Sequence, residues 1–345
     1  MSEFSWPFVL STLLAGSNLD GDASTWAMEQ ILGGEATPAQ IAGFLVALRS
    51  KGETVDEITA FVDTMYRHAA PLDVEGRVVD VVGTGGDGAR TVNISTMAAV
   101  TIAGAGVRVV KHGNRASSSQ SGSADVLESL GVRLDVPVGD LGKVLDAVGI
   151  TFCFAPAFHP SMRFAGPTRK ELGIPTTFNF LGPLANPARP AAMAVGVSDS
   201  AVAPLMAGVL ARRGVDALVF RGDDGLDELT TATTSHVWVV SDGDVTEESF
   251  DPSRLGIEPA GDGALTGGDA DFNADVFRRV IGGEKGAVRD AVLLNAAAGI
   301  AAFDAGSDPL EDRLANSLGR AAESIDSGSA ARVLEAWIAA TAEAI

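Results

Sequence analysis

Residues 81–88 read Val81-Val82-Gly83-Thr84-Gly85-Gly86-Asp87-Gly88 and continue the valine-rich segment that begins at Arg77. The run predicts a buried strand, and the glycines that follow it allow main-chain N–H groups to approach an anion closely. A helix is expected over residues 94–104, and Asn93, Ser95 and Thr96 stand at its positive dipole end. The segment therefore predicts a phosphate-binding turn between a strand and a helix.

A second strand is expected over residues 107–110, and it leads into Lys111, His112 and Arg115. Lys111 and Arg115 supply the positive charge that a phosphate needs. Asp87 is the exception, because a carboxylate repels a phosphate unless a cation or a ligand hydroxyl lies between them. Asp87 therefore indicates a metal ion or a sugar beside the phosphate.

Common nucleotide motifs fit this segment poorly. The P-loop pattern G-x-x-x-x-G-K-[ST] is absent. Gly83, Gly85 and Gly88 match the bare G-x-G-x-x-G register, but that fingerprint also requires an acidic residue after the second strand, where this chain has Lys111. Taken alone, the turn leaves open both a phosphate site and an ordinary connection between a strand and a helix.

Two capping signals organise the first 70 or so residues. Thr37-Pro38-Ala39-Gln40 and Thr54-Val55-Asp56-Glu57 each place a hydroxyl before a helix and a Gln or Glu three residues later. Apolar residues then recur at helical spacing after each cap. No strand signal precedes Val78. A separate all-helical domain is therefore expected, with residues 69–76 as its connection to the rest of the chain.

From Val78 onward, short apolar runs alternate with helical stretches. Strands are expected over 151–154, 193–197 and 217–220, with a later strand over 236–240, and residues 273–345 are expected to be mainly helical. Such alternation predicts an α/β domain with a mostly parallel central sheet. Ligands of such sheets bind beyond the carboxyl ends of the strands, so the glycine turn lies at the expected ligand-binding edge.

Composition restricts the classes of partner. The 345 residues carry a formal net charge of −20, so a nucleic-acid or anionic-membrane partner is not expected. No apolar run is long enough to cross a bilayer and no secretory signal opens the chain, which favours a cytoplasmic enzyme. The single cysteine, Cys153, lies in an apolar run and is expected to be a buried strand residue.

These segments resemble the signature loops of the anthranilate phosphoribosyltransferases, a family of tryptophan biosynthesis. Besides the glycine turn, the resemblance includes residues 111–119, 154–160, 178–187 and 225–228. It implies a fold of the nucleoside phosphorylase and phosphoribosyltransferase type, with an active site between two domains. The helical domain would comprise residues 1–71 with a returning segment at about 163–180, and the α/β domain the rest of 72–345. The resemblance also implies a homodimer formed by the helical domain.

The reaction implied is transfer of a 5-phosphoribosyl group from phosphoribosyl pyrophosphate (PRPP) to the amine of anthranilate, with release of pyrophosphate. Magnesium would be required, with two ions expected per site and held by Ser95, Asp227 and Glu228. No catalytic residue is certain, although His112 is a candidate general base. The PRPP-binding residues implied are Gly83, Gly85, Gly86, Asp87, Thr91, Asn93, Ser95, Thr96, Lys111 and Ser119. The anthranilate-binding residues implied are Gly83, Asn114, His159 and Arg169.

One departure from the family pattern concerns the acceptor. The family commonly has a polar residue, often histidine, where this chain has Phe164. A related phosphoribosyltransferase that uses another aromatic amine therefore remains an alternative. A pyrimidine nucleoside phosphorylase is a second alternative, because it shares the fold, but residues 83–88 do not fit its glycine loop. A non-catalytic relative that binds nucleic acid is a third, which the negative charge disfavours.

Overall fold

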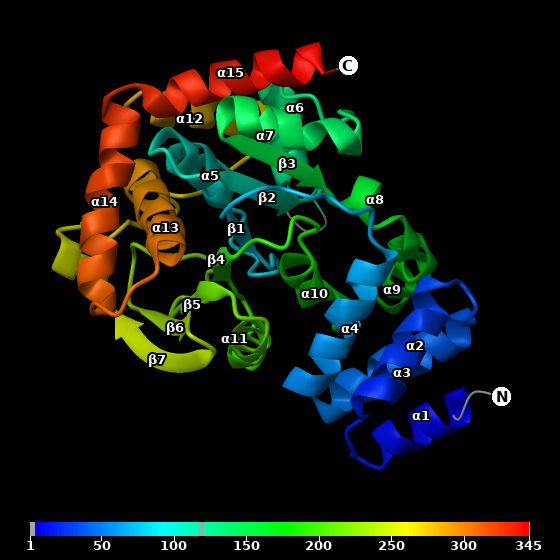
Figure 1. The fold of residues 1–345 in the computed structure, drawn as a ribbon. Coiled ribbons are helices and arrows are strands. Elements are labelled where there is room, and N and C mark those ends of the chain that lie inside the picture. Colours follow the sequence, from blue (N-terminus) through cyan, green and yellow to red (C-terminus); the bar gives the residue numbers. More distant parts are fainter. Residues whose placement is uncertain (1–3, 117–119, 345) are drawn as a thin grey trace.

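The computed structural model describes residues 4–116 and 120–344 (Figure 1). The N-terminal part is helical, as predicted, and comprises α1 (Trp6–Leu14), α2 (Gly21–Leu32), α3 (Pro38–Lys51) and α4 (Val55–His68). Both predicted capping boxes are confirmed. Thr37 and Gln40 cap α3 reciprocally, and Thr54 and Glu57 do the same for α4.

The larger part is built on one sheet of seven strands in the order β3-β2-β1-β4-β5-β6-β7. Neighbours from β3 to β5 are parallel, whereas β6 and β7 join antiparallel, which confirms the prediction of a mostly parallel sheet. The strands are β1 (Val79–Gly83), β2 (Val109–Gly113), β3 (Ile150–Phe154), β4 (Ala192–Gly196), β5 (Asp216–Gly222), β6 (Ser235–Ser241) and β7 (Asp244–Phe250).

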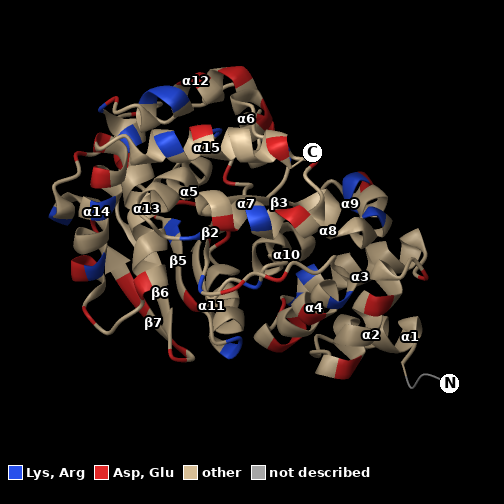
Figure 2. Ribbon diagram, turned by 45° about the horizontal axis from the view of Figure 1, so that its top comes forward, with Lys and Arg blue, Asp and Glu red and all other residues tan. Residues whose placement is uncertain are grey.

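Two strands differ from the sequence prediction. Strand β2 runs on to Gly113, so Lys111 lies inside the strand and pairs in register with Phe152 of β3. Strand β7 was not predicted. It is an edge strand with six exposed residues before Phe250, and its acidic residues are coloured red in Figure 2. An edge strand that is exposed on both faces lacks the apolar pattern from which strands are recognised.

Alternate residues of the strands enter two different apolar cores. Ala192 and Ala194 face a core that includes α5 (Ile94–Gly104), α13 (Ala287–Asp304) and α15 (Ser329–Glu343). Met193 and Val195 face a second core, which includes α11 (Ala203–Arg212) and continues into the helical domain. This alternation follows from the period of two in a strand. The sheet is therefore covered on both faces, with the helical domain against one of them.

The remaining helices flank these two layers. Helix α7 packs between β3 and α15, and α12 packs on α6. The helices and short helical turns not yet named are α6 (Ser123–Leu130), η1 (Val138–Asp140), α7 (Leu141–Val148), α8 (Ala155–Phe158), η2 (Pro160–Phe164), α9 (Gly166–Leu172), α10 (Phe178–Leu184), η3 (Pro252–Leu255), α12 (Ala270–Ile281) and α14 (Leu310–Asp326). The C-terminal part is thus mainly helical, as predicted.

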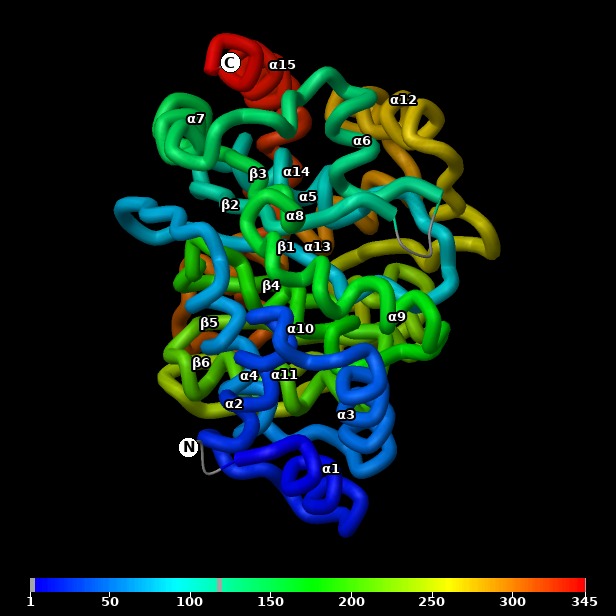
Figure 3. Tube along the Cα trace, turned by 90° about the vertical axis from the view of Figure 1, so that its right-hand side faces the viewer, coloured from blue at the N-terminus to red at the C-terminus, as the bar shows by residue number. Residues whose placement is uncertain are grey.

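A segment after β3 returns to the helical domain. Helix α9 contacts α3, and the short turn η2 contacts α2 (Figure 3). Ala165, between them, is fully buried in the core that contains the helices of the N-terminal part. We therefore propose the division of the chain that the sequence predicts, with residues 163–180 assigned to the helical domain.

Two further observations concern the chain as a whole. Cys153 is fully buried in β3, as predicted, and burial raises the pKa of its thiol. Within residues 4–116 and 120–344, no helix combines the length and apolar character that spanning a membrane requires.

Candidate active site

The glycine turn leaves β1 in a conformation that requires glycine. Gly85, Gly86 and Gly88 have φ values of 69°, 86° and 74°, which lie in the left-handed region. The turn is anchored to the end of β4, because the Thr84 N–H donates to the Gly196 carbonyl at 3.0 Å and the Ser198 hydroxyl donates to the Gly85 carbonyl at 2.8 Å. The loop is therefore held in a defined shape at the carboxyl edge of the sheet.

An acidic segment from beyond β5 reaches the same edge. The Gly85 N–H donates to Asp227 Oδ2 at 2.6 Å. A Cβ on Gly83 would lie 2.3 Å from Asp227 Oδ2, and one on Gly196 would lie 1.7 Å from the Asp227 carbonyl oxygen. Glycine is therefore required at the ends of both β1 and β4. Asp227 is pressed directly against the glycine turn, so the structure joins two segments about 140 residues apart.

The negative charge of the carboxylates at this edge is not fully compensated by nearby positive side chains. Burial, together with the nearby charge of Asp87, raises the pKa of Asp227 to about 7. Burial also raises the pKa of Glu228 well above its usual range, and the charge of Asp227 adds to this, whereas Lys111 opposes it. A divalent cation would relieve the repulsion among these groups, and carboxylate oxygens are the ligands that Mg²⁺ prefers.

The acidic residues do not make a complete metal site by themselves. Within the described parts of the chain, no three Asp, Glu, His or Cys side chains are arranged to hold a metal ion. Asp227 and Glu228 with the Ser95 hydroxyl are a fitting partial set, because Mg²⁺ usually keeps water and phosphate oxygens as its other ligands. The donor set therefore fits a magnesium ion that arrives with a phosphorylated substrate.

Lys111 is buried beneath the glycine turn with 1% of its surface exposed. Its Nζ donates to the Val81 carbonyl at 2.6 Å and to Ser95 Oγ at 3.2 Å. Burial lowers the pKa of Lys111, whereas the charges of Asp80 and Glu228 raise it. The structure therefore links a predicted phosphate-binding cation to the predicted metal-binding hydroxyl.

Asp80 and Asn186 support this arrangement, and the sequence assigned neither of them a role. Asp80 is fully buried and accepts hydrogen bonds from the His112 N–H at 3.2 Å and from Asn186 Nδ2 at 2.8 Å. Burial raises the pKa of Asp80 and the charge of Lys111 opposes that rise, which leaves the pKa at about 6. Aspartate in the middle of a buried apolar strand was the signal that could have identified it, because buried carboxylates need partners.

Other predicted donor-binding residues lie at the start of α5 and in the residues just before it. Asn93 precedes α5 and donates from Nδ2 to the Ser121 carbonyl at 3.0 Å, and Thr91 pairs with Thr266 in an isolated bridge. The Thr96 hydroxyl oxygen is buried and has no hydrogen-bond partner among the described residues. Ser119, also predicted to bind PRPP, lies outside the described residues.

The two histidines lie together below this edge. The rings of His112 and His159 are 5.3 Å apart between centroids. His112 Nδ1 lies 3.1 Å from the Gly182 carbonyl, and His159 Nε2 lies 2.9 Å from the Ala185 carbonyl, so each of these nitrogens carries a proton and donates. Burial, together with the nearby His159, lowers the pKa of His112 to about 3. His112 is therefore neutral at neutral pH.

Arg169 lies on α9, on the segment that returns to the helical domain. Its guanidinium carbon is 5.3 Å from the centroid of the Phe178 ring. Its Nε–H is buried without a hydrogen-bond partner, and no carboxylate pairs with it in the part of the chain that the structure describes. Burial lowers its pKa. A half-buried guanidinium with an unused donor is suited to bind the carboxylate of a ligand.

Asn114 and Phe164 are more exposed than Arg169, whereas His159 is buried. Asn114 is exposed and its side-chain Oδ1 accepts from the Arg115 N–H at 2.7 Å. Phe164 is 36% exposed and its ring lies against Gly34, where a Cβ would come within 2.8 Å of it. An exposed aromatic ring therefore stands at this position, with the Arg163 guanidinium carbon 4.8 Å from its centroid.

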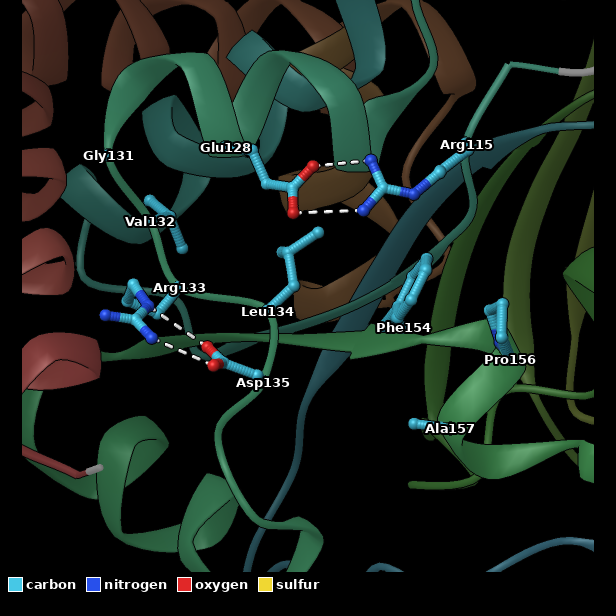
Figure 4. A pocket seen from close by; sticks show the side chains of 10 residues that line it. All are labelled: Arg115, Glu128, Gly131, Val132, Arg133, Leu134, Asp135, Phe154, Pro156 and Ala157. Carbon is cyan, nitrogen blue, oxygen red and sulfur yellow. Dashed lines mark hydrogen bonds and ion pairs between the residues drawn. The ribbon is translucent and has the colours of Figure 1, made fainter.

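A separate groove of about 670 Å³ opens beside the loop that follows β2 (Figure 4). Arg115, which the sequence predicted to supply positive charge for a phosphate, lines this groove and not the glycine turn, whereas the residues assigned to PRPP and anthranilate are absent from its lining. Its two arginines already have partners, since Arg115 pairs with Glu128 and Arg133 pairs with Asp135. These pairs neutralise the charge that an anionic substrate would need, so the groove does not replace the site at the glycine turn.

The acidic segment is held in place by hydrogen bonds from a residue that the sequence prediction missed. Asn295 of α13 is fully buried. Its Oδ1 accepts from the Leu229 N–H at 2.9 Å, and its Nδ2 donates to the Leu229 carbonyl at 3.0 Å. It therefore fixes the residue that follows Asp227 and Glu228. A single amide inside an apolar helical run was the available signal, because such a group must find partners.

Comparison with known proteins agrees with this geometry. Residues 8–69 match the helical bundle domain of a glycosyl transferase family, and residues 75–331 match the a/b domain of that family. An anthranilate phosphoribosyltransferase from a Nocardioides species is 62% identical over 337 residues, which cover 98% of this chain and 99% of the relative. One from an Arthrobacter species is 61% identical, with 97% and 96% covered.

Solved structures give the same result. The anthranilate phosphoribosyltransferase of Thermus thermophilus superposes with a TM-score of 0.90 at 40% identity, covering 97% of this chain and 99% of that one. The enzyme of Saccharomyces cerevisiae in complex with PRPP and Mg superposes with a TM-score of 0.88 at 28% identity, covering 99% of each chain. By its sequence, its fold and the residues gathered at its glycine turn, this chain belongs to the anthranilate phosphoribosyltransferase family.

Proposed function

We propose that this chain transfers the 5-phosphoribosyl group of PRPP to the amine of anthranilate and releases pyrophosphate. The observation that carries the proposal is the contact between the glycine turn and the acidic segment, where Gly85 donates to Asp227. This contact puts backbone donors beside magnesium-binding carboxylates, a combination that suits a pyrophosphate group. The yeast relative with PRPP and Mg supports the same reading.

The donor would occupy the carboxyl edge of β1 and β2. Lys111 uses two of its three N–H donors on Val81 and Ser95, which leaves one for a phosphate oxygen. The start of α5 adds the positive end of a helix dipole, and the buried Thr96 hydroxyl adds a donor. The remaining donor-binding residues are proposed as the sequence predicts: Gly83, Gly85, Gly86, Asp87, Thr91, Asn93 and Ser119.

Magnesium would be held by Ser95, Asp227 and Glu228, and we propose two ions per active site. When bound, magnesium supplies positive charge to the pyrophosphate oxygens and so favours departure of that group. The chain itself stabilises the same charge through Lys111 and the backbone N–H groups of the glycine turn. These groups are fixed before the reaction, so they need no reorganisation as the negative charge develops.

Departure of pyrophosphate would leave carbon 1 of the ribose with oxocarbenium character, as in the cleavage of glycosides. The acceptor amine carries a lone pair, so the chain need not generate a nucleophile or form a covalent intermediate. The unprotonated Nε2 of His112 is buried with no partner among the described residues, but the low pKa of the ring makes it a weak base. A general-base role for His112 stays a prediction.

The acceptor would bind between the domains, with Arg169 opposite its carboxylate and Gly83, Asn114 and His159 nearby. The unused buried Nε–H of Arg169 supports this assignment most directly. Phe164 supports a narrower proposal, in which the outer part of the acceptor path is apolar. Another aromatic amine therefore remains a second candidate acceptor.

We also propose a homodimer formed by the helical domain. Phe8 is 48% exposed, Leu14 79% and Val46 44%, and these apolar side chains lie on α1 and α3. Helices α1 and α3 pack on each other, so the exposed residues belong to one helical layer. Replacing Leu14 with glutamate should convert the dimer to a monomer on a sizing column. A native protein that already elutes as a monomer would refute the dimer.

The cytoplasmic location stays a prediction.

The reaction can be tested by the loss of anthranilate fluorescence in the presence of protein, PRPP and Mg²⁺. Loss that requires all three components, with release of one pyrophosphate per anthranilate consumed, is the expected result. No loss with anthranilate, but pyrophosphate release with another aromatic amine, would favour the second acceptor. No reaction with any amine would contradict the proposed function.

A further inference from the structure

Three segments that are distant in sequence are joined by a chain of hydrogen bonds through two side-chain amides. Asn273 of α12 is 2% exposed. Its Oδ1 accepts from the Gly268 N–H at 2.8 Å, and its Nδ2 donates to Asn93 Oδ1 at 2.9 Å. Asn93 Nδ2 in turn donates to the Ser121 carbonyl at 3.0 Å. The bonds connect the start of α12, the start of α5 and the loop after β2.

The direction of these bonds is determined at the Asn273 end. An amide side chain has one accepting end and one donating end. The backbone N–H of Gly268 can only donate, so it requires the oxygen of Asn273, and the amide nitrogen must then face Asn93. Asn93 is thereby required to present its oxygen to Asn273 and its nitrogen to Ser121. If the Asn93 amide were rotated by half a turn, its NH2 group would face the NH2 group of Asn273 and its oxygen would face the Ser121 carbonyl oxygen.

The Gly268 end is itself attached to the short segment that links the glycine turn to α5. The Val92 N–H donates to the Leu265 carbonyl at 2.9 Å, and the Gly267 N–H donates to the Arg90 carbonyl at 2.8 Å. A Cβ on Gly267 would lie 2.7 Å from the Thr91 carbonyl oxygen, so the two strips of backbone are in close contact. Asn273 therefore determines the orientation of Asn93 relative to the turn that precedes it.

We propose that Asn273 is a positioning residue for the phosphoribosyl donor and that it acts through Asn93. It sets which end of the Asn93 amide faces the loop after β2 and how Asn93 is placed beside the start of α5. The inference rests on the proposed function, in which Asn93 belongs to the PRPP site. Asn273 is not a catalytic residue, because its amide is committed to Gly268 and Asn93.

The isosteric variant Asn273→Asp keeps the acceptor for Gly268 but replaces the donor that faces Asn93 with a carboxylate oxygen. We expect the KM for PRPP to rise about tenfold, equivalent to about 1.4 kcal/mol, while the KM for anthranilate stays within a factor of about two. Calorimetry with PRPP and Mg²⁺, without anthranilate, should show the same loss of affinity. Equal changes in both KM values would overturn the proposal.

The control variant is Ser324→Ala. The Ser324 hydroxyl donates to the Thr101 carbonyl at 2.7 Å, so this change removes one buried hydrogen bond at the opposite end of α5. It is expected to lower the melting temperature without changing the KM for PRPP. If Ser324→Ala raised that KM as much as Asn273→Asp does, the effect would be a general loss of stability and the proposal would be wrong.

A double-mutant cycle separates this inference from the proposed function. If Asn273 acts through Asn93, the variant Asn93→Ala, Asn273→Ala should bind PRPP no more weakly than Asn93→Ala alone. Additive losses would overturn the inference while leaving Asn93 in the donor site. An unchanged affinity for PRPP in Asn93→Ala would remove Asn93 from that site and overturn both assignments.

Discussion

His112 carries a prediction about acid stability that follows from its burial. The ring is 4% exposed and its Nδ1–H donates to the Gly182 carbonyl. Asparagine at this position can donate to the same carbonyl, but it cannot take up a proton. The change His112→Asn should therefore lower the stability of the protein at neutral pH, by opening a small cavity, and should also remove part of its sensitivity to acid.

The sign and size follow from the two pKa values. The folded pKa of His112 is about 3, and its ordinary value is 6.5. Between these values only the unfolded chain binds the proton, so the free energy of unfolding falls as the pH falls below 6.5. At about pH 5, some 1.5 units below 6.5, the loss is about 2 kcal/mol at 1.36 kcal/mol per unit. Above the unfolded pKa the contribution is constant.

Urea denaturation of the native protein and of His112→Asn at about pH 5 and about pH 8 measures this directly. The native protein should lose about 2 kcal/mol more than the variant does between the two pH values. Between about pH 7.5 and pH 9 the difference in stability between the two proteins should stay constant. A difference that is the same at acid and neutral pH would refute the reasoning, because it would mean that the folded state protonates His112 as readily as the unfolded chain.

Other predictions concern the two substrates and the acidic segment. The variant Asp227→Ala, Glu228→Ala should lose Mg²⁺-dependent turnover while its circular dichroism stays native, and retained turnover would contradict the metal assignment. Arg169→Ala should raise the KM for anthranilate at least tenfold with little change for PRPP, since a charged hydrogen bond contributes about 1.5–3 kcal/mol; the reverse pattern would mean that the acceptor site lies elsewhere. Gly196→Ala should lower the free energy of unfolding by about 3 kcal/mol and abolish turnover, because its Cβ would overlap the Asp227 carbonyl. Gly139→Ala, where no atom lies within 4 Å of the new Cβ, is the matched control, and an equal loss there would refute the steric argument.

Local signals predicted the elements that surround the site well. Helix α5 has the bounds expected for it, and both capping boxes formed, because a cap involves residues only three apart. The glycine turn was also readable, since positive φ values require residues without a Cβ. Such features depend on interactions within a few residues, so their sequence patterns are sufficient.

Features that depend on distant partners were harder to predict. Lys111 is expected at a strand end but lies inside β2, because pairing with β3 extends the strand to Gly113. Strand β7 has no apolar face and forms only because β6 offers it an edge. Asn273 and Asn295 lie in helices far along the chain, and only packing brings them against Asn93 and Leu229.

The sequence alone determined the family, the two kinds of domain and the chemistry of the glycine turn, because these follow from residue types at short fixed spacings. Tertiary structure decided how the site is assembled. Gly83 and Gly196 must lack a Cβ because Asp227 arrives from beyond β5 and occupies that space. The charge of Asp227 is likewise a tertiary property, since it depends on burial and on Asp87 in another loop. Contacts between segments about 140 residues apart leave no local pattern, so only the folded chain reveals them.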